Sequence, residues 1–96
     1  MNIIKLLPKT SAFAENKDVA REIRIKDITP ILEKNEEIIL DFEGIDSTTQ
    51  SFIHALISEL IRVFGNEILE NIYFKNCNKN VQNIINIVVE YMQAAV

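Results

Sequence analysis

The chain has 96 residues, 48% of them hydrophobic, with only two glycines and two prolines, a composition typical of one ordered globular domain. Its formal net charge of −4 argues against a nucleic-acid partner, because phosphate-binding surfaces need clustered lysine and arginine. The single cysteine, Cys77, and the lack of a charged leader followed by a long apolar run favour a reducing, cytoplasmic setting with no membrane partner.

The first half of the chain predicts a strand, an interrupted helix and a second strand. The apolar run at residues 2–7 is closed by Pro8, as expected for a first strand. From Asn16 onward apolar residues recur at helical spacing, and Pro30 predicts either a kink near residues 26–29 or a new helix with Thr29 as its N-cap. The nearly continuous apolar run within residues 36–42 is typical of a central strand with both faces of its sheet covered.

The second half predicts a strong helix at residues 50–64 that ends before Gly65, a third strand at residues 70–76, and a last helix capped by Asn78 or Asn80. The order β-α-β-α-β-α indicates an α/β fold in which a small mixed or mostly parallel sheet is flanked by helices. The first strand could be antiparallel at an edge. We expect residues 1–96 to form a single domain.

A hydroxyl-rich turn precedes the helix at residues 50–64. Ser47 and Gln50 match a capping box, which explains at least one hydroxyl as a simple helix cap. A turn between a central strand and a helix N-terminus is also where open α/β sheets place binding sites. We therefore expect residues 46–51 to form the rim of a partner site, with their hydroxyls and the helix N-terminus in solvent, while Phe52 turns inward. The turn lacks the glycines of a nucleotide-binding P-loop.

The same helix carries two apolar stripes, one of which contains Ile57 and Ile61. This stripe either packs on a neighbouring helix or forms a surface for a partner or for a second copy. His54 lies on the polar side of the helix with Ser51, without an acid or a set of metal ligands beside it. A simple hydrogen-bonding role is therefore favoured over a catalytic one.

The sequence "LDFEGID", the hydroxyl-rich turn, an apolar helix that opens with "SF" and ends in "FG", a short strand and an Asn-started helix together resemble the STAS-like domain family of unknown function. The resemblance covers roughly residues 16–92. That family is similar in outline to the anti-sigma factor antagonists, small bacterial regulators in which a partner kinase phosphorylates a serine at the start of the corresponding helix. A gap-free comparison puts Thr49 at the aspartate of their Asp-Ser-Ser sequence, Gln50 at the phosphoacceptor and Ser51 at the next serine, while Phe52 replaces their glycine.

These observations predict a non-enzymatic interaction or regulatory module of bacterial or phage type, without catalytic residues, metals or cofactors. The expected partner is an ATPase or kinase-like regulator, a phage or host protein, or a second copy of the chain. If a kinase acts here, Ser51 and Thr49 are the candidates for phosphorylation. Two alternatives remain open, a small enzyme that uses Asp46, His54 and the loop hydroxyls, and a homo-oligomeric structural domain. The predicted partner-binding residues are Asp46, Ser47, Thr48, Thr49, Gln50, Ser51, His54, Ile57 and Ile61.

Overall fold

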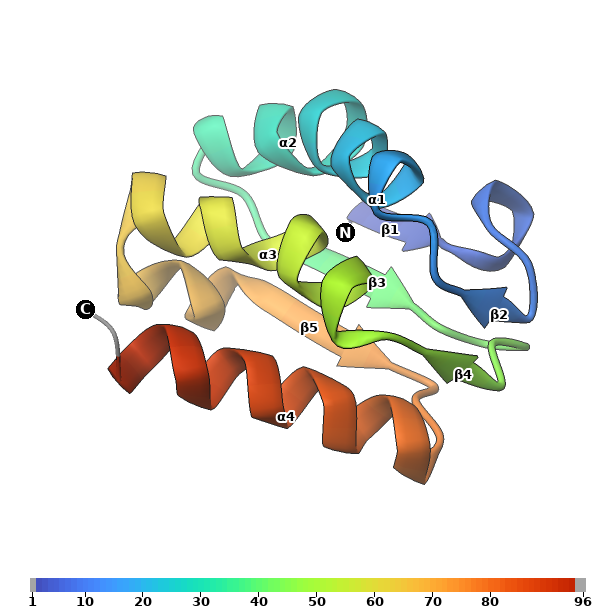
Figure 1. The fold of residues 1–96 in the computed structure, drawn as a ribbon. Coiled ribbons are helices and arrows are strands. Elements are labelled where there is room, and N and C mark those ends of the chain that lie inside the picture. Colours follow the sequence, from blue (N-terminus) through green and yellow to red (C-terminus); the bar gives the residue numbers. More distant parts are fainter. Residues whose placement is uncertain (1, 95–96) are drawn as a thin grey trace.

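The computed structural model describes residues 2–94 and confirms the α/β fold (Figure 1). Three parallel strands form the main sheet in the order β1-β3-β5, with β1 at Asn2–Lys5, β3 at Ile38–Asp41 and β5 at Ile72–Lys75. The strand at residues 38–41 is central, as predicted. The first strand lies at an edge but is parallel, so the antiparallel alternative is wrong.

Neighbouring parallel strands must be joined by crossover connections, and most of the helices lie in these connections. The first crossover contains α1 (Lys17–Ile23), a π-helical turn η2 (Arg24–Ile28) and α2 (Thr29–Glu33), and the second contains α3 (Gln50–Phe64) and the 3₁₀ segment η3 (Asn66–Asn71). The last helix, α4 (Lys79–Ala94), packs beside α3, opposite α1. None of the helices within residues 2–94 is both long enough and apolar enough to cross a membrane.

The irregularity near Pro30 is a wide turn rather than a break. Pro30 has no N–H to donate back along the helix, and the turn before it adopts π geometry, in which the Thr29 N–H bonds to the Arg24 carbonyl. The predicted disturbance near residues 26–29 is thus confirmed. The prediction that Thr29 caps a new helix is wrong, because its backbone is helical and its side chain makes no capping bond.

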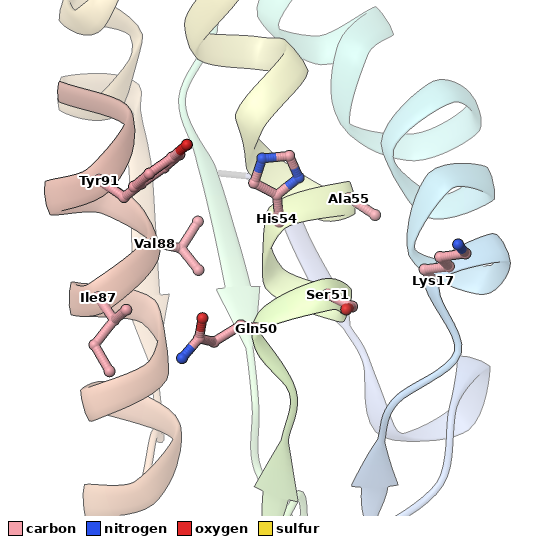
Figure 2. A pocket seen from close by; sticks show the side chains of 8 residues that line it. All are labelled: Lys17, Gln50, Ser51, His54, Ala55, Ile87, Val88 and Tyr91. Carbon is pink, nitrogen blue, oxygen red and sulfur yellow. The ribbon is translucent and has the colours of Figure 1, made fainter. Parts of the chain in front are cut away.

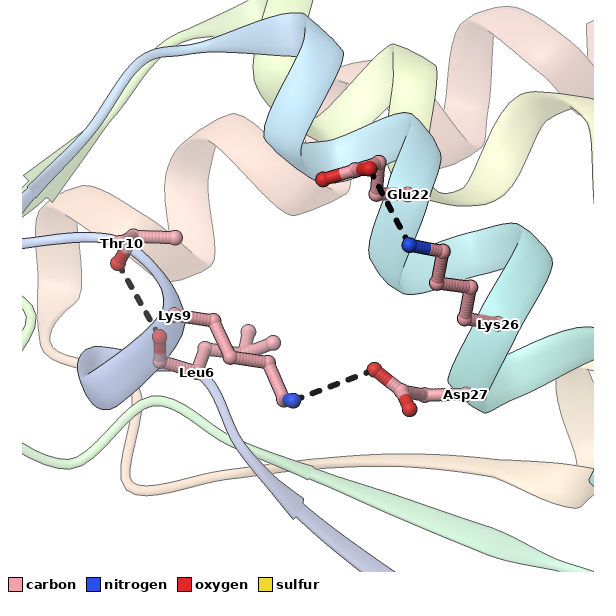
Figure 3. Close-up of polar contacts among 6 residues, drawn as sticks. All are labelled: Leu6, Lys9, Thr10, Glu22, Lys26 and Asp27. Atoms are coloured by element: carbon pink, nitrogen blue, oxygen red, sulfur yellow. Dashed lines mark hydrogen bonds and ion pairs between the residues drawn. The ribbon is translucent and has the colours of Figure 1, made fainter.

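A second, two-stranded parallel sheet escaped prediction. It pairs β2 (Phe13–Ala14) with β4 (Ser47–Thr48), in line with the carboxyl end of the main sheet. Between β1 and β2 the chain turns through a short 3₁₀ segment, η1 (Leu7–Lys9). In Figure 3 the Thr10 hydroxyl donates to the Leu6 carbonyl and the Lys9 ammonium pairs with Asp27 at 3.4 Å, which ties this turn to η2.

The helix boundaries follow from caps. The Asn16 side chain accepts from the N–H groups of Asp18 and Val19 at the start of α1, and the Asn78 side chain accepts from the Val81 N–H at the start of α4, which confirms Asn78 rather than Asn80 as the cap. Helix α3 ends before Gly65, whose φ of 88° suits glycine, although its ψ of 169° lies outside the left-handed helical region.

The helices leave one face of the main sheet uncovered. Ile38 and Leu40 point toward the helices and are fully buried, whereas Ile3, 58% exposed, and Tyr73, 40% exposed, flank the half-buried Ile39 on the opposite face. The expectation that both faces of the sheet are covered is therefore wrong for the described part of the chain.

Candidate functional site

The hydroxyl-rich turn is only partly exposed, because half of it is a strand. Ser47 and Thr48 form β4 beside Phe13 and Ala14. The Thr48 hydroxyl donates to the Ala14 carbonyl at 2.7 Å, and the side chain is buried. The prediction that Thr48 faces solvent is wrong, since strand pairing turns it into the core.

Thr49, not Ser47, caps helix α3. The Thr49 hydroxyl oxygen accepts from the Phe52 N–H at 3.1 Å, and Thr49 has the extended backbone of an N-cap. The capping box predicted for Ser47 and Gln50 is wrong, because Ser47 is held in β4. Phe52 is fully buried, as expected.

A shallow groove of about 450 Å³ crosses the first turns of α3 (Figure 2). On the α4 side, Gln50 lies opposite Ile87 and His54 lies opposite Tyr91. On the α1 side, Ser51 lies toward Lys17. The complete lining comprises Lys17, Gln50, Ser51, His54, Ala55, Ile87, Val88 and Tyr91. The structure thus brings Gln50, Ser51 and His54 of the predicted site together on one surface.

Two exposed apolar side chains, Ile87 and Tyr91, form the α4 wall of the groove. They are one helical turn apart and are 47% and 66% exposed. The opposite wall carries hydrogen-bonding groups on the first turn of α3, where backbone N–H groups have no partner within the helix. The lining contains one lysine and one histidine but no carboxylate, although the whole chain is acidic. The groove therefore combines an apolar anchor with a donor-rich rim.

The two candidate phosphorylation residues have different environments. Ser51 is exposed in the first turn of α3 and lines the groove. Thr49 is half-buried, and its hydroxyl oxygen is engaged in the cap. The geometry thus favours Ser51 over Thr49 as an accessible acceptor.

Asp46 lies outside the groove, although it remains exposed. Its main chain is fixed on both sides, because its N–H donates to the Ala12 carbonyl and its own carbonyl accepts from the Asn78 side chain at 2.7 Å. Asp46 and Ser47 therefore belong to the β2–β4 sheet and its contact with the start of α4.

His54 is half-buried and pairs with the Ser58 hydroxyl, whose oxygen lies 3.4 Å from the His54 Nδ1 atom. Ser58 is buried, so its hydroxyl is not presented to the groove. Among residues 2–94, no three or more His, Cys, Asp and Glu side chains cluster as a metal site would require.

Ile57 and Ile61 lie in the hydrophobic core, 0% and 2% exposed. Helix α3 is enclosed by the sheet, by α1 on one side and by α4 on the other. The Arg24 side chain adds a hydrogen bond from η2 to the Ala55 carbonyl of α3 at 2.9 Å. The prediction that Ile57 and Ile61 form a partner surface is wrong, and the alternative that they pack against neighbouring helices is confirmed.

Polar groups at the ends of β3 and β5 have structural partners. Hydrogen bonds from the Asn76 side chain and from the Glu43 N–H lower the pKa of Asp41. Burial raises the pKa of the Cys77 thiol to about 11, with a smaller contribution from Asp41. A thiol with that pKa stays protonated at neutral pH and is a poor nucleophile.

Five groove residues were not among the predicted site residues, namely Lys17, Ala55, Ile87, Val88 and Tyr91. A signal for two of them existed, because Ile87 and Tyr91 are apolar but lie off the buried face of the last helix, which contains Val81, Ile85, Val88 and Met92. An apolar pair spaced by four residues outside the core face is a candidate contact surface. Lys17 carries no such signal, since its place depends on how α1 packs on α3.

The family model described as "STAS-like domain of unknown function" matches residues 19–82, two thirds of the chain. The match begins within α1 and ends in the first turn of α4, so it includes β3, the hydroxyl-rich turn and all of α3. Neither the curated proteins nor the solved structures yielded a significant match.

Proposed function

The chain belongs to the family of STAS-like domains of unknown function, and from that premise we propose that it is a non-enzymatic interaction module that binds a partner protein in the groove across α3. The observation that carries this proposal is the exposed pair of Ile87 and Tyr91 opposite the polar side chains of Gln50 and His54. Large aromatic side chains next to polar groups are the usual anchors of protein interfaces.

The partner offers a short apolar segment to Tyr91 and Ile87, with acceptor groups aimed at the first turn of α3. The absence of carboxylates from the lining favours a partner whose contacting polar groups are acceptors or acids. The groove alone is smaller than a stable interface, which buries about 800 Å² on each partner. The contact therefore extends beyond the groove along α3 and α4.

A regulatory version of this proposal places a phosphate on Ser51. A phosphoserine adds a charge of about −1.5 to −2 and would lie near both Lys17 and the free N–H groups of α3. It would fill the donor-rich rim and displace the partner's acceptor groups. A kinase-like regulator of bacterial or phage type is the partner class that suits this version.

Affinity purification of the tagged chain from its native cells, followed by quantitative mass spectrometry, tests the proposal. We expect Tyr91→Ala to reduce recovery of the specific partner at least about tenfold, since central anchors contribute about 2 kcal/mol or more. Val63→Ala is the matched control, because Val63 is as exposed as Tyr91, at 67%, but lies at the far end of α3. Equal recovery with Tyr91→Ala and the wild type would refute the groove as the binding site.

The same preparation addresses the enzyme alternative. A screen against nucleotides, phosphoesters and acyl esters is expected to show no turnover. A turnover that is lost with His54→Ala would overturn the non-enzymatic proposal.

A further inference from the structure

The uncovered face of the main sheet is a second candidate interaction surface, on the opposite side from the groove. All-parallel sheets are found almost only with both faces covered, because their strands are apolar on both sides. Here Ile3, Ile39 and Tyr73 are in register and form an apolar row across all three strands of the sheet. No element within residues 2–94 covers this row.

Charged side chains lie on both sides of the apolar row. The next row on this face toward the carboxyl ends of the strands, two residues along each strand, contains Lys5, Asp41 and Lys75. Asp41 is engaged by Asn76 and by the Glu43 N–H, so the two exposed lysines dominate this end.

The opposite end of the face is acidic. Glu37 lies two residues before Ile39 in the chain, and its carboxylate accepts from the Tyr73 hydroxyl at 2.9 Å, which places it on the open face. Along the strand direction the open face therefore carries Glu37, then the apolar row, then Lys5 and Lys75.

This arrangement is complementary to itself. A two-fold axis that lies in the plane between the two sheets, parallel to the apolar row, lays the row of one copy on that of the other. The same rotation brings Glu37 of each copy to the end occupied by Lys5 and Lys75 in its partner. We propose that the uncovered sheet face is the interface of a symmetric homodimer, in which the Ile3–Ile39–Tyr73 rows pack together and Glu37 of each copy pairs with Lys5 and Lys75 of the other.

The dimer leaves the groove across α3 free, because the groove lies on the helical side of the sheet. Each dimer would present two grooves that face away from each other. This inference does not rest on the proposed function, since self-association is measured without any other partner.

Light scattering coupled to size-exclusion chromatography, run as a dilution series, tests the proposal with charge swaps. Glu37→Lys places three lysines in each contact, and Lys5→Glu with Lys75→Glu places three acids there. We expect each variant alone to raise the dissociation constant about a hundredfold, because like charges that face each other across an interface cost several kcal/mol.

An equimolar mixture of the two charge variants is the decisive arm. In a mixed dimer the lysine at position 37 of one chain meets two glutamates, and Glu37 of the other chain meets two lysines, so the mixture is expected to form a heterodimer with the wild-type affinity. All substituted side chains are exposed, and circular dichroism checks that the variants fold.

Three results would overturn the proposal: a monomeric wild type over the whole dilution series, a wild-type dimer that neither charge variant weakens, or a mixture that stays monomeric. A dimer abolished by Tyr91→Ala but not by the charge variants would likewise overturn it, because the groove would then be the self-association site.

Discussion

Replacing Ile57 by alanine tests whether the apolar stripe of α3 that contains Ile57 and Ile61 belongs to the core or to the surface. Ile57 is fully buried, and the substitution removes three carbon atoms from the contacts that α3 makes with its neighbours. At about 0.8 kcal/mol for each buried methylene-sized group the transfer cost is about 2.4 kcal/mol, and the cavity raises the expected loss to about 2–5 kcal/mol.

Urea denaturation followed by circular dichroism measures this loss as a free energy of unfolding, and thermal unfolding measures it as a change in Tm. For a domain of this size about 1 kcal/mol corresponds to about 4–8 °C in Tm, so Ile57→Ala is expected to lower Tm by at least about 10 °C. Val63→Ala, at an exposed position of the same helix, should change the free energy of unfolding by less than about 0.5 kcal/mol. A similarly small loss with Ile57→Ala would refute the assignment of this stripe to the core.

Three further predictions concern the cap and the groups with shifted pKa values. Thr49→Ala is expected to cost about 1 kcal/mol in urea denaturation and Ser47→Ala clearly less, because only Thr49 caps α3; the reverse order would contradict the assigned cap. The lowered pKa of Asp41 stabilises the fold above the ordinary carboxyl pKa, and this contribution is lost as the pH falls through the folded value. Asn76→Gly, which suits the positive φ at that position, should therefore raise the pKa of Asp41 in an NMR titration, and an unchanged pKa would contradict the assigned hydrogen bond. Cys77, whose pKa is raised to about 11, should react with iodoacetamide at pH 7.5 much more slowly in the folded chain than in urea, and equal rates would contradict its burial.

The order of the main elements could be predicted from the sequence because each has a strong local signal. The periodic apolar residues of α3 and α4, the Asn78 cap and the short apolar runs of β1, β3 and β5 do not depend on distant partners. The inward orientation of Phe52 followed from the same periodicity.

The β2–β4 sheet could not be predicted, because each of its strands has two residues and pairs with a segment more than thirty residues away. Ser47 and Thr48 are good capping residues by type, yet strand pairing determines their conformation here. The uncovered sheet face was also hidden, since the run of β3 is apolar on both faces whether or not a second layer follows.

The candidate site was only partly predictable for the same reason. Gln50, Ser51 and His54 were identified from the start of α3, but their neighbours Lys17 and Tyr91 come from helices whose placement depends on tertiary packing. Ile57 and Ile61 were misassigned because periodicity shows that a helix has two apolar stripes but not which elements cover them.

A photoreactive amino acid placed at position 91, and separately at position 63, tests the central claim most directly. Both positions are exposed, on α4 beside the groove and at the end of α3 respectively, and light is applied in native cells before purification. The groove account predicts a crosslink to one discrete partner protein from position 91 and none from position 63. A crosslink from position 63 alone, or equal products from both positions, would contradict the assignment of the groove as the binding site.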